Sequence, residues 1–316
     1  MAEHDRSGDW ERKTLEKVAL AAIQEQRRAR HWGVFFKLLL FVYLFALLFI
    51  GMGWIGKKDG TSGKHTALVE LRGVIGPESS ASADNIILGL QGAFKDKGTQ
   101  GVILRINSPG GSPVQAGYIN DEIKRLRAKY PKIPVYAVVE DICASGGYYV
   151  AVAADHIYVD KGSIIGSIGV LMDGFGFTGL MEKLGIERRL LAAGENKGFL
   201  DPFSPIRESQ QKYAETMLDE IHQQFIAVVR QGRGKRLKET PELFSGLLWV
   251  GTKSVELGLA DALGSVDFVA REVIKAEEIV DFTPRENIAE RVARRFGAAM
   301  SEALVRTMTT STPVIR

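Results

Sequence analysis

The sequence predicts an α/β protein, in which a mostly parallel β-sheet is covered by helices and is preceded by one transmembrane helix. Two observations carry this prediction. From Thr66 onward, short apolar runs alternate with amphipathic segments, and such alternation is typical of βαβ units. Before them, residues 38–55 contain no charged side chain, and an apolar stretch of this length is typical of a membrane-spanning helix.

Composition is that of a globular protein and argues against several kinds of function. The 316 residues are 45% hydrophobic and 25% charged, as in ordinary folded domains. A formal net charge of +3 gives no indication of nucleic-acid binding. The single cysteine, Cys143, excludes an intramolecular disulfide, and the five scattered histidines lack metal-ligand spacing. We therefore expect no metal or other cofactor and no nucleic-acid partner.

The apolar stretch predicts a membrane anchor over residues 34–56. This length crosses a hydrocarbon core of about 30 Å. Trp32 and Trp54 lie where interfacial aromatic residues belong. A buried core helix seldom has Leu and Phe on every face, and a cleaved signal peptide would begin earlier and end in an Ala-x-Ala site.

Basic residues around the anchor predict its orientation. Basic side chains are slightly more frequent before the uncharged stretch (Arg27, Arg28, Arg30, Lys37) than after it (Lys57, Lys58, Lys64). This bias places residues 1–33 in the cytoplasm. Residues 57–65 then form a tether, and the rest of the chain lies on the periplasmic side of the inner membrane.

Hydrophobic periodicity predicts the elements of the domain at residues 66–284 in chain order. We expect strands at residues 67–71, 101–106, 134–139, 156–159 and 168–171. We expect helices at residues 84–95, 113–128 after a Ser112 cap, 148–154 and 206–230, and further helices beginning at Thr240, Thr252 and Val266.

A helix is also predicted near each end of the chain. A helix is expected at residues 14–30. Residues 285–316 are expected to form an amphipathic helix and a tail, with apolar residues every four positions and several arginines opposite them. Such a helix fits a subunit contact, core packing or an anionic lipid surface, and we favour packing.

The central stretch is residues 141–149, DICASGGYY. It places Ser145 between a predicted buried strand and a predicted apolar helix. The N–H groups of Gly146 and Gly147 then point forward from a helix N-terminus, where partial positive charge collects. This is the geometry of an activated serine beside an anion-binding hole. The alternative is that Ser145 only caps the helix, a position that serine favours.

A second glycine-containing loop, Asn107-Ser-Pro-Gly-Gly111, follows the strand before it. Its glycines allow a tight turn whose backbone N–H groups approach an oxygen closely. The carboxyl end of a parallel strand is where ligands bind in open α/β sheets. The loop is either an ordinary turn or, together with Ser145, half of a two-donor oxyanion hole.

A serine nucleophile needs a base, and the sequence offers a lysine more readily than a histidine. His156 and His222 lie in an ordinary predicted strand and helix, so we interpret both as structural. Lys197 lies in a loop rich in glycine and proline, beside Phe199 and Leu200. Lysine serves serine as a base in some enzymes, and apolar burial favours the neutral amine that this requires. A solvated loop lysine is the alternative.

Together these motifs resemble the signal peptide peptidase A (SppA) family of membrane-anchored Ser/Lys peptidases. The matching stretches are INSPGG (106–111), ASGGYY (144–149), GSIGV (166–170), the lysine loop ending at Asp201-Pro202, and residues 246–264. The similarity covers residues 66–275, and the 52-residue interval from Ser145 to Lys197 fits the short, single-repeat form. The family more often has Tyr-Lys-Asp where this chain has Asn-Lys-Gly.

The resemblance implies a role for each matching residue. Ser145 is the nucleophile, Lys197 the general base and Ser167 the serine that orients the lysine amine. Gly111 and Gly146 supply the N–H groups of the oxyanion hole. The implied fold is the spiral ββα fold of Clp-type proteases and crotonases. A Ser-His-Asp mechanism of the Clp type does not fit, because Val170 stands about where the histidine would be.

The sequence therefore predicts a serine endopeptidase of the inner membrane with a Ser145–Lys197 dyad. The resemblance implies that its substrates are released signal peptides, and that it forms a homo-oligomeric, octamer-like ring whose dyads are shared between copies. The alternatives are a crotonase-like acyl-CoA enzyme, which needs neither the dyad nor the membrane span, and a non-catalytic membrane scaffold.

Overall fold

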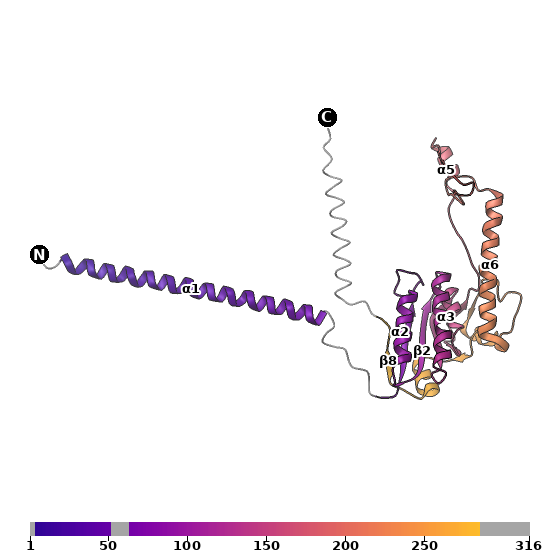
Figure 1. The fold of residues 1–316 in the computed structure, drawn as a ribbon, viewed down its shortest axis with the longest axis horizontal. Helices are drawn as coiled ribbons and strands as arrows, with labels where there is room; N and C mark the ends of the chain where they lie inside the picture. The colour runs from indigo at the N-terminus through magenta and orange to yellow at the C-terminus, as the bar shows by residue number, and fades with distance from the viewer. Residues whose placement is uncertain (1–3, 52–62, 285–316) are drawn as a thin grey trace. The chain divides into compact units, whose positions relative to one another are not determined.

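The computed structural model describes residues 4–51 and 63–284 (Figure 1). The described residues fall into two compact units: the N-terminal helix, and a domain that ends at Pro284. The predicted amphipathic helix at residues 285–316 and most of the predicted tether lie outside the described residues. The predicted domain boundaries at these two places therefore stay predictions.

The N-terminal unit is a single helix, α1 (His4–Gly51), of 48 residues. It joins the predicted helix at residues 14–30 and the predicted membrane anchor without a break. Its stretch Ile23–Leu47 is long and apolar enough to cross a membrane. Trp32 packs against Phe35 and Phe36 with ring centroids 5.7 Å apart. This helix agrees with the predicted anchoring in a membrane.

The domain is built on a sheet of eight strands. Six of them follow the order β6-β5-β3-β2-β1-β8, and β4 pairs with β3 and with β7. Every pair is parallel except β5 with β6. The strands are β1 (His65–Arg72), β2 (Thr99–Ser108), β3 (Val135–Ala144), β4 (His156–Val159), β5 (Ile164–Gly166), β6 (Leu248–Val250), β7 (Ala262–Leu263) and β8 (Ile279–Asp281).

Helices cover both faces of this sheet. The helices of the domain are α2 (Ala83–Lys95), α3 (Pro113–Lys129), α4 (Gly146–Ala151), α5 (Thr178–Lys183), α6 (Glu208–Arg233), α7 (Gly251–Glu256) and α8 (Val266–Phe268). α2 and α3 lie side by side over one face (Figure 1) and bury the main core with it. Ser82 and Ser112 cap α2 and α3 by accepting from the backbone N–H three residues on. The segment from α8 through Val269–Ile274 covers a smaller cluster on the other face.

The α/β class with a mostly parallel sheet is confirmed, and two predicted elements are wrong. Residues 168–171 do not form a strand, because the chain turns at Ser167 and Gly169 N–H donates to Ser167 O at 2.9 Å. Residues 241–246 form turns in place of a helix, with i-to-i+3 bonds such as Leu243 N–H to Thr240 O at 3.1 Å.

Between Ile168 and α6 the chain forms an extension that we call the arm, residues 169–207. Its large apolar side chains are mostly exposed: Leu171, Phe175, Leu184 and Leu191 are 79%, 79%, 63% and 97% exposed. In Figure 1 the arm's helix α5 lies beyond the end of α6 that is farther from the sheet. The arm contacts the first turns of α6, since Leu200 N–H donates to Gln210 Oε1 at 3.4 Å.

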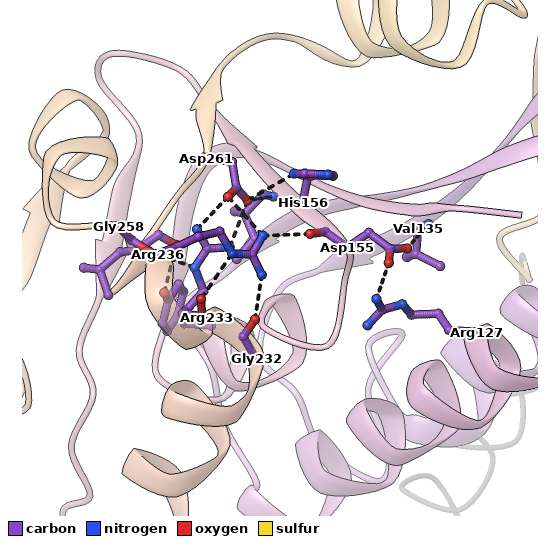
Figure 2. A network of polar contacts seen from close by, with 12 residues as sticks. Arg127, Val135, Asp155, His156, Gly232, Arg233, Arg236, Gly258 and Asp261 are labelled. Atoms are coloured by element: carbon purple, nitrogen blue, oxygen red, sulfur yellow. Dashed lines mark hydrogen bonds and ion pairs between the residues drawn. The ribbon is translucent and has the colours of Figure 1, made fainter. Parts of the chain in front are cut away.

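The opposite end of α6 is fixed to the sheet by a buried ion pair (Figure 2). The side chain of Arg233 is 1% exposed and donates to both carboxylate oxygens of Asp261 at 2.8 and 2.9 Å. Asp261 also accepts from Ile157 N–H at 2.7 Å, and Arg236 adds a bond to it at 3.1 Å. Burial alone would raise the pKa of Asp261, but hydrogen bonds and the charge of Arg233 outweigh it and lower the pKa.

Candidate active site

Ser145 lies on a strained turn between β3 and α4. Its backbone has φ 50° and ψ −123°, a region that costs a non-glycine residue on the order of 1–3 kcal/mol. Although Ser145 stands at the N-cap position of α4, its side chain makes no capping hydrogen bond. Capping by the side chain therefore does not account for this serine, whereas a strained strand-to-helix turn is the setting of a nucleophilic serine.

Ser167 lies next to Ser145 because β3 and β5 run parallel and in register. The last pair of the ladder is Ala144 with Gly166, and Ser145 N–H donates to Gly166 O at 2.9 Å. Ser167 follows Gly166 with φ 49°, so both serines adopt the left-handed region. Neighbouring strands are about 4.8 Å apart, which puts the two serines within reach of one group bound between them.

Gly111 and Gly146 bring two backbone N–H groups together. A Cβ built on Gly146 would lie only 3.3 Å from Gly111 N. A Cβ on Gly111, whose φ is +145°, would lie 2.1 Å from Ile75 O, so this turn requires glycine. Gly146 begins α4, and the first N–H groups of a helix have no partner within it. The pair can therefore donate to one oxygen held beside Ser145.

Ser108 holds this loop in place, which the sequence analysis did not predict. Its hydroxyl is fully buried, donates to Gly73 O at 2.6 Å and accepts from Gly110 N–H at 3.1 Å. Gly147 packs against the backbone of Ser108, because a Cβ on Gly147 would lie 3.0 Å from Ser108 O. A serine just before Pro-Gly-Gly is the sequence signal that would have indicated this role.

Lys197 is not joined to Ser145 within the chain. It is exposed in the arm, and no hydrogen bond or ion pair involves its ammonium among the described residues. The arm meets α6 at Gln210, whereas α4 meets it through the Tyr149–Phe225 ring contact at 5.3 Å. At a rise of 1.5 Å per residue these two points of α6 are about 22 Å apart.

The remaining titratable candidates have contacts of their own. His156 Nδ1 lies 3.9 Å from Asp261 Oδ2 in the network at the end of α6. His222 Nε2 lies 3.0 Å from Ile168 O. Burial raises the pKa of the Cys143 thiol, so this cysteine stays protonated. In residues 4–51 and 63–284 no group of His, Cys, Asp and Glu is arranged to hold a metal.

These features together suit acyl transfer. Ser145, half-buried on a strained turn, lies beside the backbone N–H groups of Gly111 and Gly146, and such an arrangement stabilises a tetrahedral oxyanion. A crotonase-like enzyme would use the same donors for a thioester oxygen, so the geometry alone does not choose between the two chemistries.

Similarity to known proteins decides the family. The pattern that describes peptidase family S49 matches residues 127–280. A putative protease, MJ0651 of Methanocaldococcus jannaschii, is 32% identical over 216 residues, which are 67% of this chain and 68% of that protein. The chain belongs to peptidase family S49. A putative signal peptide peptidase SppA of Enterococcus faecium is 29% identical over 72% of this chain and 67% of its own length.

The chain spans about a quarter of some larger relatives. A protein of Brucella melitensis named Na(+)/H(+) antiporter NhaA is 46% identical over 177 residues, which are 56% of this chain and 24% of that protein. Among solved structures, a mutant of the 1510-N membrane-bound stomatin-specific protease is 12% identical with a TM-score of 0.39, over 71% of this chain and 100% of that chain. The family assignment rests on the sequence relatives.

Proposed function

We propose that this protein is a membrane-anchored serine endopeptidase with a Ser145–Lys197 dyad that degrades released signal peptides. The observation that carries the proposal is the strained turn of Ser145 beside the N–H groups of Gly111 and Gly146. Membership in a peptidase family favours peptide hydrolysis over acyl-CoA chemistry and over a non-catalytic scaffold.

The geometry supports a two-step reaction. Ser145 Oγ attacks the peptide carbonyl while the neutral amine of Lys197 takes the hydroxyl proton. Gly111 and Gly146 donate to the oxyanion that forms. Lys197 then gives its proton to the leaving amine, and a water molecule hydrolyses the acyl-enzyme. Ser167, in register beside Ser145, orients the lysine amine by accepting from it.

The lysine reaches the serine from a neighbouring copy in a homo-oligomer, and an octamer-like ring is the expected assembly. Two features of the chain support this. Lys197 is exposed and unpaired among the described residues, and the arm that carries it exposes many large apolar side chains. Exposed apolar patches of this kind mark interfaces. A closed ring would also bury the amine and so favour its neutral form.

The substrate class is supported by the anchor and by one relative. Helix α1 provides an apolar stretch able to cross the membrane, which keeps the site close to peptides that leave the bilayer. The Enterococcus faecium relative is named a putative signal peptide peptidase. We propose the same substrates here, with the N-terminus in the cytoplasm and the domain from residue 66 onward in the periplasm. A reporter active only outside the cytoplasm, fused after residue 66, should be active, and an inactive one would reverse this topology.

The nucleophile can be tested by labelling. The full-length protein, purified in detergent, is treated with a fluorophosphonate, and the modified peptide is identified by mass spectrometry. The adduct is expected on Ser145 alone, and Ser145→Ala should prevent both the adduct and cleavage of a fluorogenic peptide. Cleavage by the Ser145→Ala protein, or an adduct on another serine that abolishes activity, would overturn the assignment.

A further inference from the structure

His222 lies at the base of the arm, where two segments leave the body of the domain together. One segment is the chain after Ile168, which is fully buried at the end of the sheet. The other is the N-terminal half of α6, in which most residues before His222 are exposed. His222 Nε2 lies 3.0 Å from Ile168 O and so joins the two segments at the point from which both diverge.

The arm beyond this point is internally connected. Phe177 N–H donates to Pro202 O at 2.7 Å, and the Phe199 ring meets the Tyr213 ring with centroids 5.9 Å apart. Gln210, which is 6% exposed, accepts from Leu200 N–H. These contacts attach the lysine loop to the first turns of α6, so a change in the angle of that half of the helix would carry the lysine loop with it.

The position of Lys197 therefore depends on the angle that the arm makes with the body of the domain at His222. Gln210 and His222 are about 18 Å apart along α6 at 1.5 Å per residue. A tilt of about 10° at His222 would displace the lysine loop by about 3 Å. A misplacement of about 1 Å can cost a catalytic group roughly 10²-fold in rate, so a change of angle at the base of the arm would alter the rate at the site.

We propose that His222 is a positioning residue for the dyad: its Nε2–H donates to Ile168 O and sets the angle of the arm, and so the place of Lys197, relative to the body of its own chain. A carbonyl oxygen only accepts, so Nε2 carries the proton in this bond. Ser167 is the residue before Ile168, and its N–H donates to Leu247 O at 2.8 Å. The bond thus fixes the N-terminal half of α6 against the chain that follows β5, which ends at Gly166. This inference rests on the proposed Ser145–Lys197 function.

The test compares two amide substitutions. In His222→Gln the amide nitrogen lies near the place of Nε2 and can still donate to Ile168 O. In His222→Asn it lies near the place of Nδ1 and falls short. Gln224→Asn, at an exposed position of the same helix, is the matched control for the shorter side chain. Peptide cleavage by the full-length proteins gives kcat and KM, and thermal unfolding confirms folding.

We expect His222→Asn to lose about 10- to 100-fold in kcat with KM within about threefold of the parent. His222→Gln should keep most of the parent kcat, and Gln224→Asn should match the parent. A parent-like His222→Asn protein would show that the bond does not position the site. A folded His222→Gln protein as slow as His222→Asn would show that the ring itself acts in the reaction. Either result overturns the inference.

The same series includes Lys197→Ala, which separates this inference from the function on which it rests. If Lys197→Ala keeps the parent activity, the proposed dyad is wrong whatever the His222 variants do. If Lys197→Ala is inactive and His222→Asn is unimpaired, the dyad stands and only the role of His222 is refuted.

Discussion

The carboxyl ends of β2, β3 and β5 differ sharply from the arm that carries Lys197. At the strand ends, glycines and serines are packed so closely that an added Cβ on Gly110 would lie 2.7 Å from Gly146 N. In the arm, Leu191 is 97% exposed and Gly174, Gly176 and Gly179 have no atom within 4 Å of an added Cβ. The turns of Ser145, Gly111 and Gly146 are therefore closely packed within one chain, whereas the arm that carries Lys197 is exposed.

This difference has a physical consequence. The strand ends gain their geometry from backbone hydrogen bonds and sheet register, which one chain provides alone. A lysine base needs burial to favour its neutral form, and the arm of one chain does not bury Lys197. Under the proposed function, the turn of Ser145 and the N–H groups of Gly111 and Gly146 are formed within one chain, while Lys197 would need a second copy to bury it.

The largest expected effect tests whether both halves are needed. Ser145→Ala and Lys197→Ala should each reduce peptide cleavage by on the order of 10³-fold or more, because members of a dyad act as a unit. Steady-state kinetics of the full-length proteins measure this. Lys183→Ala, an exposed lysine in α5 of the same arm, is the control and should keep the parent rate. Activity of Lys197→Ala within about tenfold of the parent would refute its role as base.

A second prediction contrasts the buried ion pair Arg233–Asp261, at the end of α6 opposite to the arm, with an exposed ion pair in the first turns of α6. Asp261→Asn leaves the buried Arg233 without its counter-charge and should lower the free energy of unfolding by about 3–5 kcal/mol. Glu208→Gln breaks the exposed pair with Lys212 and should change stability little. Denaturant unfolding measures both, and equal effects would contradict the contrast.

The stabilisation by Asp261 should also depend on pH. Its pKa is lowered in the folded protein, so the unfolded state binds the proton more readily. The stabilisation is therefore present above the ordinary aspartate pKa of about 3.9 and is lost as pH falls below it. In Asp261→Asn the free energy of unfolding should no longer show this loss at acidic pH. If the loss at acidic pH is unchanged in the variant, Asp261 does not cause it.

A further prediction concerns the N–H groups of Gly111 and Gly146. Gly146→Ala places a methyl group 3.3 Å from Gly111 N and 3.4 Å from Ala116 Cβ, which the fold can accept with small shifts. The methyl group crowds the oxyanion, so kcat should fall about 10²-fold with little loss of stability. Gly117→Ala, where nothing lies within 4 Å, is the control. Loss of kcat in both variants would mean that the effect does not come from the oxyanion hole.

Much of this site could be predicted from the sequence because backbone patterns define it. Apolar runs predict β1, β2 and β4 to within a few residues. β3 continues to Ala144, five residues beyond the predicted end at 139, because the chain stays extended past Glu140 and Asp141 to pair with β5. The approach of Ser145 to Ser167 follows from that pairing, which motif spacing alone does not reveal.

The rest depends on tertiary contacts that no local pattern records. Residues 168–171 are apolar, a pattern that predicts a strand, yet Leu171 is 79% exposed because it lies in the arm. The local pattern predicts an ordinary helix residue at His222, and the packing of α6 brings its ring to Ile168 O. The number of residues between Ser145 and Lys197 is known from the sequence, but the direction in which the arm carries Lys197 away from Ser145 is not.

The central claim is that the working site combines Ser145 of one copy with Lys197 of another, and subunit mixing tests it most directly. Inactive full-length Ser145→Ala and Lys197→Ala proteins are allowed to exchange subunits, with exchange verified by native mass spectrometry. Some interfaces then pair an intact Ser145 with an intact Lys197, so a fraction of the parent activity should return. If subunits exchange and no activity returns, the dyad lies within one chain and the claim is contradicted.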